Sequence, residues 1–147
     1  MNRMEAPVSS GARFALALCL AWLATGTAIA QDPRASAVQA VARDWLVLID
    51  RGEAPASWNA AGKRFQAAMP LSGWADTLRK ERIPLGAVGS RAALRTSFQK
   101  QFAGVPEGDY ALVGFETSFA ERPQGHETVT LEREDDGNWR VVGYFVR

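Results

Sequence analysis

The sequence contains one cysteine among 147 residues, and that cysteine lies in an apolar segment near the N-terminus. Beyond Cys19 there is no thiol for a disulfide, a thiolate nucleophile or a cysteine metal ligand. Exported domains are often stabilised by disulfides, so the part of the chain that follows must rely on its packed core.

Histidine is equally scarce, since His126 is the only one in the chain. A single histidine without cysteines does not make a zinc site of the usual kind. The sequence also has no phosphate-binding glycine loop, no nucleophile elbow and no metal-binding motif. We therefore expect no cofactor and no metal. His126 follows an expected turn with Pro123 and Gly125, where it is either an exposed residue at the edge of the turn or a general base.

The chain carries no excess of charge. Its net charge is +1, and Arg3, Arg13 and Glu5 account for that value, so residues 31–147 have equal numbers of acidic and basic side chains. A neutral domain has no electrostatic preference for nucleic acid or for an anionic membrane. We expect neither partner for the mature protein.

The N-terminal segment has the pattern of a signal peptide. Arg3 and Arg13 precede the apolar run from Phe14 to Leu23, and Ala28-Ile29-Ala30 matches the small-x-small site that a signal peptidase cleaves. Ten apolar residues form a helix of about 15 Å, which is half of a bilayer core. We expect cleavage between Ala30 and Gln31, and a periplasmic or secreted domain at residues 31–147; translation starts at Met1 or Met4.

The first half of residues 31–147 is typical of helices. Asp32-Pro33 is a helix start, and apolar residues at spacings of three and four continue to a stop at Arg51-Gly52. A second helix is predicted from Pro55 to Met69, ended by Pro70. A third begins at Ser72 and ends at Pro84, with Arg79, Lys80 and Arg82 matched to the helix dipole.

The second half is typical of strands, because its apolar residues recur with a period of two. We predict strands at 88–99, 110–119, 127–133 and 138–146, with a turn at Pro123–Gly125 and a hairpin at Asp136-Gly137. On the first strand, Ala92, Leu94, Thr96 and Phe98 are expected to share one face. On the last strand, one face is expected to carry Trp139, Val141, Gly143 and Phe145. The opposite face is expected to carry Val142, Tyr144 and Val146.

Helices followed by strands indicate a segregated α+β fold. The simplest arrangement packs the N-terminal helices on a curved, four-stranded antiparallel meander sheet. Residues 1–30 are then a signal peptide and residues 31–147 a single domain.

Several segments resemble a bacterial family known as domain of unknown function 4019. The segments are Trp45 to Asp50, Gly52, Ser57-Trp58, Arg82 to Gly86, Arg91, Phe115 to Phe119, Glu127 to Thr130 and Gly137 to Phe145. The resemblance implies an exported bacterial protein and provides no catalytic residues. The order of elements also looks like the cystatin-like and nuclear-transport-factor-2-like folds, which host unrelated functions. Gln101 to Gly104 does not match the Q-x-V-x-G motif of cystatin inhibitors.

Two sets of residues are candidates for a site. Glu116 and Tyr144 form an acid/base pair if their strand faces line a cavity; the alternative places Glu116 on a solvated or dimer face. Trp58 and Trp74 lie on short helices, where they line an apolar pocket or fill the core.

The missing motifs favour a non-catalytic domain that binds a small apolar ligand or a protein partner. One alternative is a small isomerase or hydrolase that uses Glu116, His126 or Tyr144. Another is a homodimer formed through the sheet, with an outer apolar patch at Val142, Tyr144 and Val146.

Overall fold

The computed structural model describes residues 32–147, so the predicted signal peptide and its cleavage site lie outside the described residues. Helix α1 (Pro33–Asp50) begins where the sequence predicts. The Asp32 side chain accepts a hydrogen bond from the backbone N–H of Arg34 at 2.9 Å, and Pro33 occupies the first turn. Within the described part of the chain, no helix is long and apolar enough to cross a membrane.

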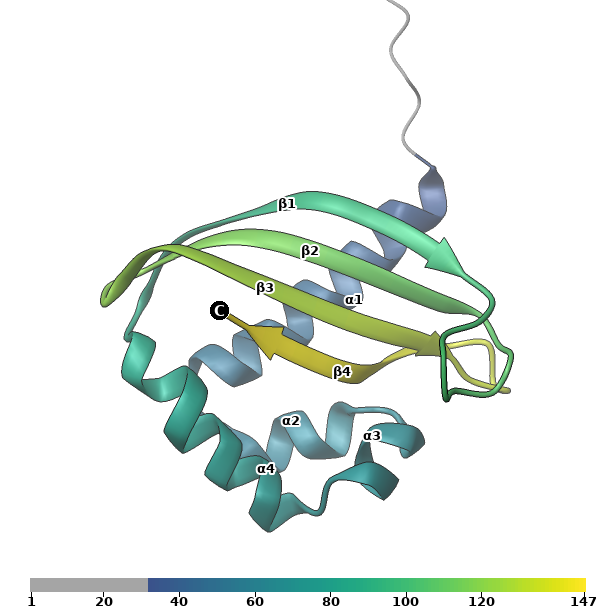
Figure 1. Cartoon of the computed structure of the whole chain (residues 1–147), viewed down its shortest axis with the longest axis horizontal. Coiled ribbons are helices and arrows are strands. Elements are labelled where there is room, and N and C mark those ends of the chain that lie inside the picture. Colours follow the sequence, from purple (N-terminus) through teal and green to yellow (C-terminus); the bar gives the residue numbers. More distant parts are fainter. Residues whose placement is uncertain (1–31) are drawn as a thin grey trace, which may run out of the picture.

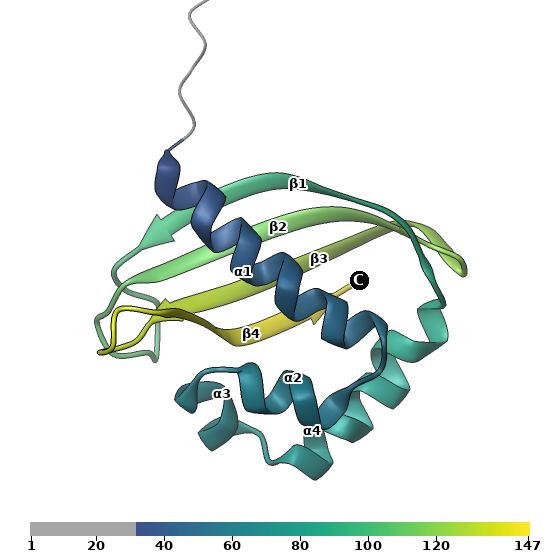
Figure 2. The ribbon, with the colours of Figure 1, turned by 180° about the vertical axis from the view of Figure 1, so that it is seen from behind.

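Four strands form one antiparallel sheet. They are β1 (Val88–Gln99), β2 (Tyr110–Phe119), β3 (Arg122–Arg133) and β4 (Trp139–Val146), in the spatial order β1-β2-β3-β4. Helix α1 crosses one face of this curved sheet, which we call the inner face (Figure 1, Figure 2). The predicted α+β fold with a four-stranded antiparallel meander is therefore confirmed.

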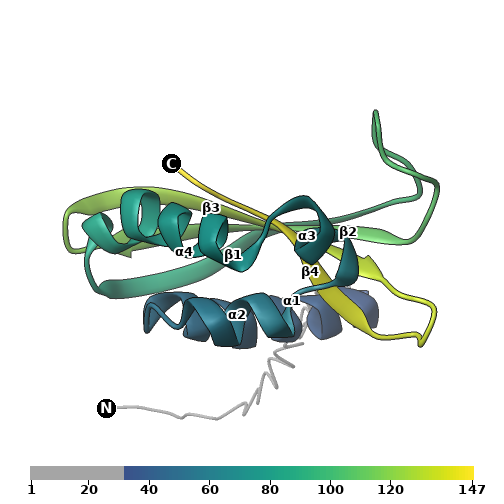
Figure 3. The same cartoon turned by 90° about the horizontal axis from the view of Figure 1, so that it is seen from below.

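The predicted second helix is divided in two, so its prediction as one helix is wrong. Helices α2 (Ala54–Ala60) and α3 (Lys63–Ala68) are separated at Ala61 and Gly62, both of which have extended backbone. The Gly62 N–H donates to the carbonyl of Val141 on β4 at 2.8 Å. A bond to the sheet edge replaces a bond within the helix, and α3 lies beside β4 (Figure 3).

The third predicted helix is present but changes its winding along its length. Helix α4 (Leu71–Thr77) continues as a π-helical turn, η1 (Leu78–Arg82), and then as a 3-10 turn, η2 (Ile83–Leu85). The segment ends at Gly86, which has a φ of 78°, a conformation that favours glycine. Arg82 is buried rather than solvated at the helix end.

The turn between β2 and β3 lies earlier than predicted. The strand β3 begins at Arg122, and Ala120 and Glu121 make the turn, so Pro123 and Gly125 belong to the strand. A Cβ atom at Gly125 would lie 2.7 Å from the Phe119 ring. Glycine at this position therefore permits close packing of Phe119 on β3, and does not mark a turn.

Bulges change the expected strand faces. The pairing of β1 with β2 shifts between Ala93 and Arg95, and the pairing of β3 with β4 shifts between Thr130 and Leu131. An extra residue in one strand reverses the face of the sheet to which each later side chain of that strand points. The two face predictions are consequently wrong over half of each strand: Arg91 shares the inner face with Phe98, and Tyr144 shares it with Val141.

The core lies between α1, the inner face and the short helices, and aromatic rings fill it. The ring of Trp45 stacks on Trp74 with centroids 5.7 Å apart, and Phe65 meets Trp74 edge-on at 5.0 Å. Tyr144 packs against Trp45 at 5.6 Å. Large aromatic rings bury much apolar area each, and this cluster takes the place of the absent disulfides.

Candidate functional site

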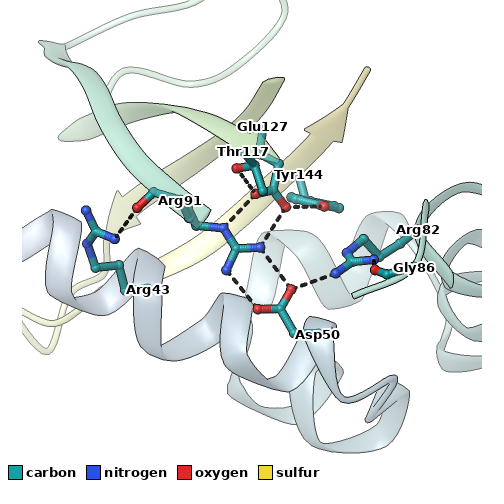
Figure 4. A network of polar contacts seen from close by, with 8 residues as sticks. All are labelled: Arg43, Asp50, Arg82, Gly86, Arg91, Thr117, Glu127 and Tyr144. Carbon is teal, nitrogen blue, oxygen red and sulfur yellow. Dashed lines mark hydrogen bonds and ion pairs between the residues drawn. The ribbon is translucent and has the colours of Figure 1, made fainter. Parts of the chain in front are cut away.

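Charged side chains from four elements meet beneath the inner face in what we call the interior charge cluster, which consists of Asp50, Arg82, Arg91 and Glu127 (Figure 4). Arg91 on β1 donates to Glu127 on β3 at 2.7 Å and to Asp50 at the end of α1 at 2.8 Å. Arg82 on η1 donates to the same Asp50 at 2.9 Å. The cluster therefore ties the helices to the sheet through alternating charges.

Glu127 is the most deeply buried member, with 1% of the residue exposed. Its carboxylate accepts from Nε and Nη2 of Arg91 at 2.7 and 3.2 Å. It also accepts from the hydroxyls of Thr117 at 2.6 Å and Tyr144 at 2.7 Å. With four donors, this carboxylate has its acceptor positions occupied and is not free to take a proton from a substrate.

Electrostatics shift the pKa values of Asp50 and of Tyr144, which donates to the cluster. Burial acts to raise the pKa of Asp50, but the hydrogen bonds and charges of Arg91 and Arg82 outweigh burial and hold that pKa below its ordinary value. Burial, followed by the negative charge of Glu127, raises the pKa of the Tyr144 phenol. Tyr144 thus stays a neutral hydrogen-bond donor.

Arg82 is the one member that is not fully satisfied. Its Nη1 donates to the carbonyl of Gly86 at 2.9 Å, and its guanidinium carbon lies 4.6 Å from the centre of the Phe119 ring. Its Nε is buried and has no partner among the described residues. The ring face of Phe119 compensates part of the desolvation of this cation.

All the segments that supply the cluster, including its donors Thr117 and Tyr144, are segments in which the sequence resembles domain of unknown function 4019. A model of that family, described as protein of unknown function (DUF4019), matches residues 41–144. The chain belongs to this family. No curated protein and no solved structure matches the chain. The predicted family membership is therefore confirmed, and the DUF4019 segments converge in space on one set of ion pairs, in which Glu127 and Arg82 are buried.

The three acid/base candidates of this DUF4019 chain do not meet. Glu116 and His126 are paired across β2 and β3 and both are exposed on the outer face, opposite α1. Tyr144 lies on the inner face and donates to Glu127 instead. The structure therefore brings Glu116 beside His126 on open surface and keeps Tyr144 on the other side of the sheet. The outer apolar patch expected at Val142, Tyr144 and Val146 is absent for the same reason.

The two candidate pocket tryptophans lie in or against the core. Trp74 is 2% exposed, and its indole N–H donates to the Ser57 hydroxyl at 2.9 Å. Trp58 is half-buried, and its indole N–H donates to the carbonyl of Met69 at 2.7 Å. Both polar atoms are satisfied within the fold, and neither ring lines the grooves described below.

An open groove lies where the inner face extends past the first turns of α1, and we call it the hairpin-end groove. Its volume is about 330 Å³, and its residues come from the start of α1, the end of β1, the loop before β2 and the β3–β4 hairpin: Arg34, Ala37, Phe98, Gln99, Lys100, Asp109, Tyr110, Arg133, Gly137 and Trp139. Figure 2 shows these segments on one side of the molecule. Phe98 and Trp139 form its apolar floor, with ring centroids 6.1 Å apart.

A larger groove of about 750 Å³ lies between α3 and the β3–β4 hairpin. It has no aromatic lining, and its charges are largely paired with each other, as in Arg64 with Glu132 at 2.9 Å and Arg140 with Glu134 at 2.7 Å. No group of three or more potential metal ligands occurs among residues 32–147. The hairpin-end groove is therefore the better candidate for a ligand site.

Little in the sequence indicates this groove or the charge cluster. Phe98 and Arg133 come from different strands, and only the pairing of the strands shows that Phe98 lies on the same face as Trp139. The sequence does contain one indication of the cluster, because each of its charged residues lies in a segment that resembles the family.

Proposed function

We propose that this DUF4019 protein is an exported, non-catalytic binding domain whose ligand occupies the hairpin-end groove. The observation that carries the proposal is the aromatic floor of Phe98 and Trp139 in a groove of about 330 Å³ that also contains four charged side chains. Ligand sites are concave, mostly apolar and supplied with a few polar groups, and their volumes start at about 300 Å³.

The non-catalytic part of the proposal is supported by the interior charge cluster. Its carboxylates and its tyrosine already have hydrogen-bond partners inside the fold, so a substrate would have to displace them. Buried carboxylates whose acceptor positions are occupied in this way help to give a fold its rigidity and uniqueness. Export is supported by the sequence pattern of residues 1–30.

Expression of the full chain in a bacterial host tests the proposal. We expect the protein in the periplasmic fraction with a mass that begins at Gln31, and we expect native mass spectrometry to detect a bound small molecule. Trp139→Leu should remove the bound mass, whereas Phe145→Ser, on the outer face, should retain it. A bound mass that survives Trp139→Leu, or a protein that stays in the cytoplasm, contradicts the proposal.

A second candidate function is self-association through the sheet. Phe145 is 59% exposed on the outer face, and its pairing partner Thr128 and the next residue in that row, Gly114, are small. An exposed ring on the outer face of a sheet is suited to meet a second copy. Sedimentation of the protein tests this candidate, because Phe145→Ser should turn a dimer into a monomer.

A further inference from the structure

The hairpin-end groove combines its aromatic floor with an excess of positive charge. Three of its residues are cationic, namely Arg34, Lys100 and Arg133, and only Asp109 is anionic. Lys100 forms an ion pair with Asp109. Arg34 is paired with Asp32 at 2.6 Å, and its guanidinium carbon lies 4.6 Å from the centre of the Phe98 ring. Two of the three cations are thus already neutralised by carboxylates.

Arg133 is the third cation, and no ion pair among residues 32–147 includes it. Its Nε donates to the carbonyl of Gly137 at 3.0 Å, which holds the guanidinium within the hairpin. The two terminal nitrogens remain for a ligand. A guanidinium that is fixed in this way is suited to bind a carboxylate through two parallel hydrogen bonds.

Trp139 lies directly beside Arg133, because the two residues are partners in the pairing of β3 with β4. The indole N–H groups of Trp45, Trp58 and Trp74 each donate to an acceptor in the fold. No acceptor among the described residues takes the N–H of Trp139. Its ring therefore offers an apolar surface and an unused donor next to the unpaired guanidinium.

We propose that the hairpin-end groove binds small flat carboxylates, which place an aromatic or similar apolar body on Trp139, beside Phe98 and the Arg34 guanidinium that covers it, and the carboxylate on Arg133. This inference rests on the proposed function and specifies its ligand class. The larger groove, which Arg133 also borders, does not fit the same ligand, because it has no aromatic surface and five carboxylates line it: Glu107, Glu132, Glu134, Asp135 and Asp136.

Three compounds of one size and three charges test the inference: phenylacetate, 2-phenylethanol and 2-phenylethylammonium. They are titrated into the protein, purified after export of the full chain, while the ¹H–¹⁵N signals of the indole groups are recorded. The Trp139 signal is identified by its loss in Trp139→Phe. We expect phenylacetate to shift this signal selectively and to bind about tenfold more tightly than 2-phenylethanol, because one charge-assisted contact is added. The ammonium compound should bind most weakly.

Variants separate charge from structure. Arg133→Gln should abolish the preference for phenylacetate over 2-phenylethanol while retaining the binding of the alcohol. Arg122→Gln is the matched control, since Arg122 is exposed at the far end of β3 and does not line the groove. Equal binding of all three compounds, or a preference that survives Arg133→Gln, overturns the inference but leaves the groove as a binding site.

No shift of the Trp139 signal with phenylacetate at millimolar concentration also overturns the inference. The proposed function is tested by a different experiment. That experiment asks whether native mass spectrometry detects a small molecule bound to the purified protein, and whether Trp139→Leu removes that molecule.

Discussion

Arg91 and Phe98 lie seven residues apart on β1, an odd spacing, and yet both side chains point to the inner face. Arg91 reaches Glu127 at 2.7 Å there, and Phe98 packs against Trp139. Regular alternation would place them on opposite faces. The irregular pairing between Ala93 and Arg95 adds one residue, Leu94, and so permits the charge cluster and the groove to share one side of the sheet.

Deletion of Leu94 should therefore damage the fold far more than its substitution. Without the extra residue, either Arg91 or Phe98 must face outwards. Loss of the ion pair between Arg91 and Glu127 alone lowers the free energy of unfolding by about 3–5 kcal/mol. Leu94 is 59% exposed, so Leu94→Ser should change the free energy of unfolding by less than about 0.5 kcal/mol. Urea unfolding compares the two proteins. Equal stability of both would show that the bulge does not determine the facing of β1.

Arg91→Met should lower the free energy of unfolding by about 3–5 kcal/mol, because it leaves Glu127 as a buried charge without a cation. Arg95→Met is the control on the same strand, since Arg95 is exposed and forms no ion pair within residues 32–147. Its effect should stay within about 0.5 kcal/mol. The stability of each variant is measured by urea unfolding, and similar losses for both would contradict a special role for the buried pair.

Acid should weaken the cluster through Asp50. The pKa of Asp50 is lowered in the folded protein, so its contribution to stability is complete above the ordinary value of about 4. That contribution is lost as the pH falls from about 4 through the lowered pKa of the folded state. Asp50→Asn should reduce stability at neutral pH and flatten the dependence on pH below about 4.

Asp44→Asn is the control for this measurement, because Asp44 is exposed on the same helix and has no ion-pair partner among residues 32–147. Thermal unfolding is followed between neutral and acidic pH. A slope that is the same in Asp50→Asn and in the unmodified protein would show that Asp50 does not contribute to the acid sensitivity.

Gly125→Ala should destabilise the protein by about 1–3 kcal/mol, the usual range for an overpacked core. The added methyl would lie 2.7 Å from the Phe119 ring and 2.9 Å from the carbonyl oxygen of Thr117. At Gly89 on β1, the nearest atom would be 3.6 Å away, which is an ordinary contact. Gly89→Ala should therefore have little effect in the same thermal unfolding assay. A harmless Gly125→Ala would mean that Phe119 is free to move aside.

The helices illustrate how far local pattern extends. Asp32-Pro33 marks the start of α1 in the sequence and in the structure, because a cap is formed within one turn of chain. The break at Gly62 has no such local cause. It depends on the carbonyl of Val141, which is 79 residues away in the chain and belongs to the edge of the sheet.

The candidate site depends on contacts between residues that are far apart in the sequence. Trp58 and Trp74 were plausible pocket residues by position, but ring packing and hydrogen bonds place them in or against the core. Arg82 has a sufficient local explanation at the end of a helix, and nothing in its neighbourhood indicates a partner at Asp50. Long-range partners of this kind are decided by which surfaces pack together, not by spacing along the chain.

By itself, the sequence determined the elements of this protein: helices first, then four strands, with caps and periods that depend on neighbouring residues. It also determined the family, because the segments that carry the resemblance remain visible without coordinates. Only the tertiary structure decided which face each strand presents. A single extra residue reverses a strand, and the pattern of apolar residues does not reveal it when both faces contain apolar side chains. The bulges in β1 and β4 therefore placed Arg91 and Tyr144 on Glu127, on the same side of the sheet as Phe98 and Trp139.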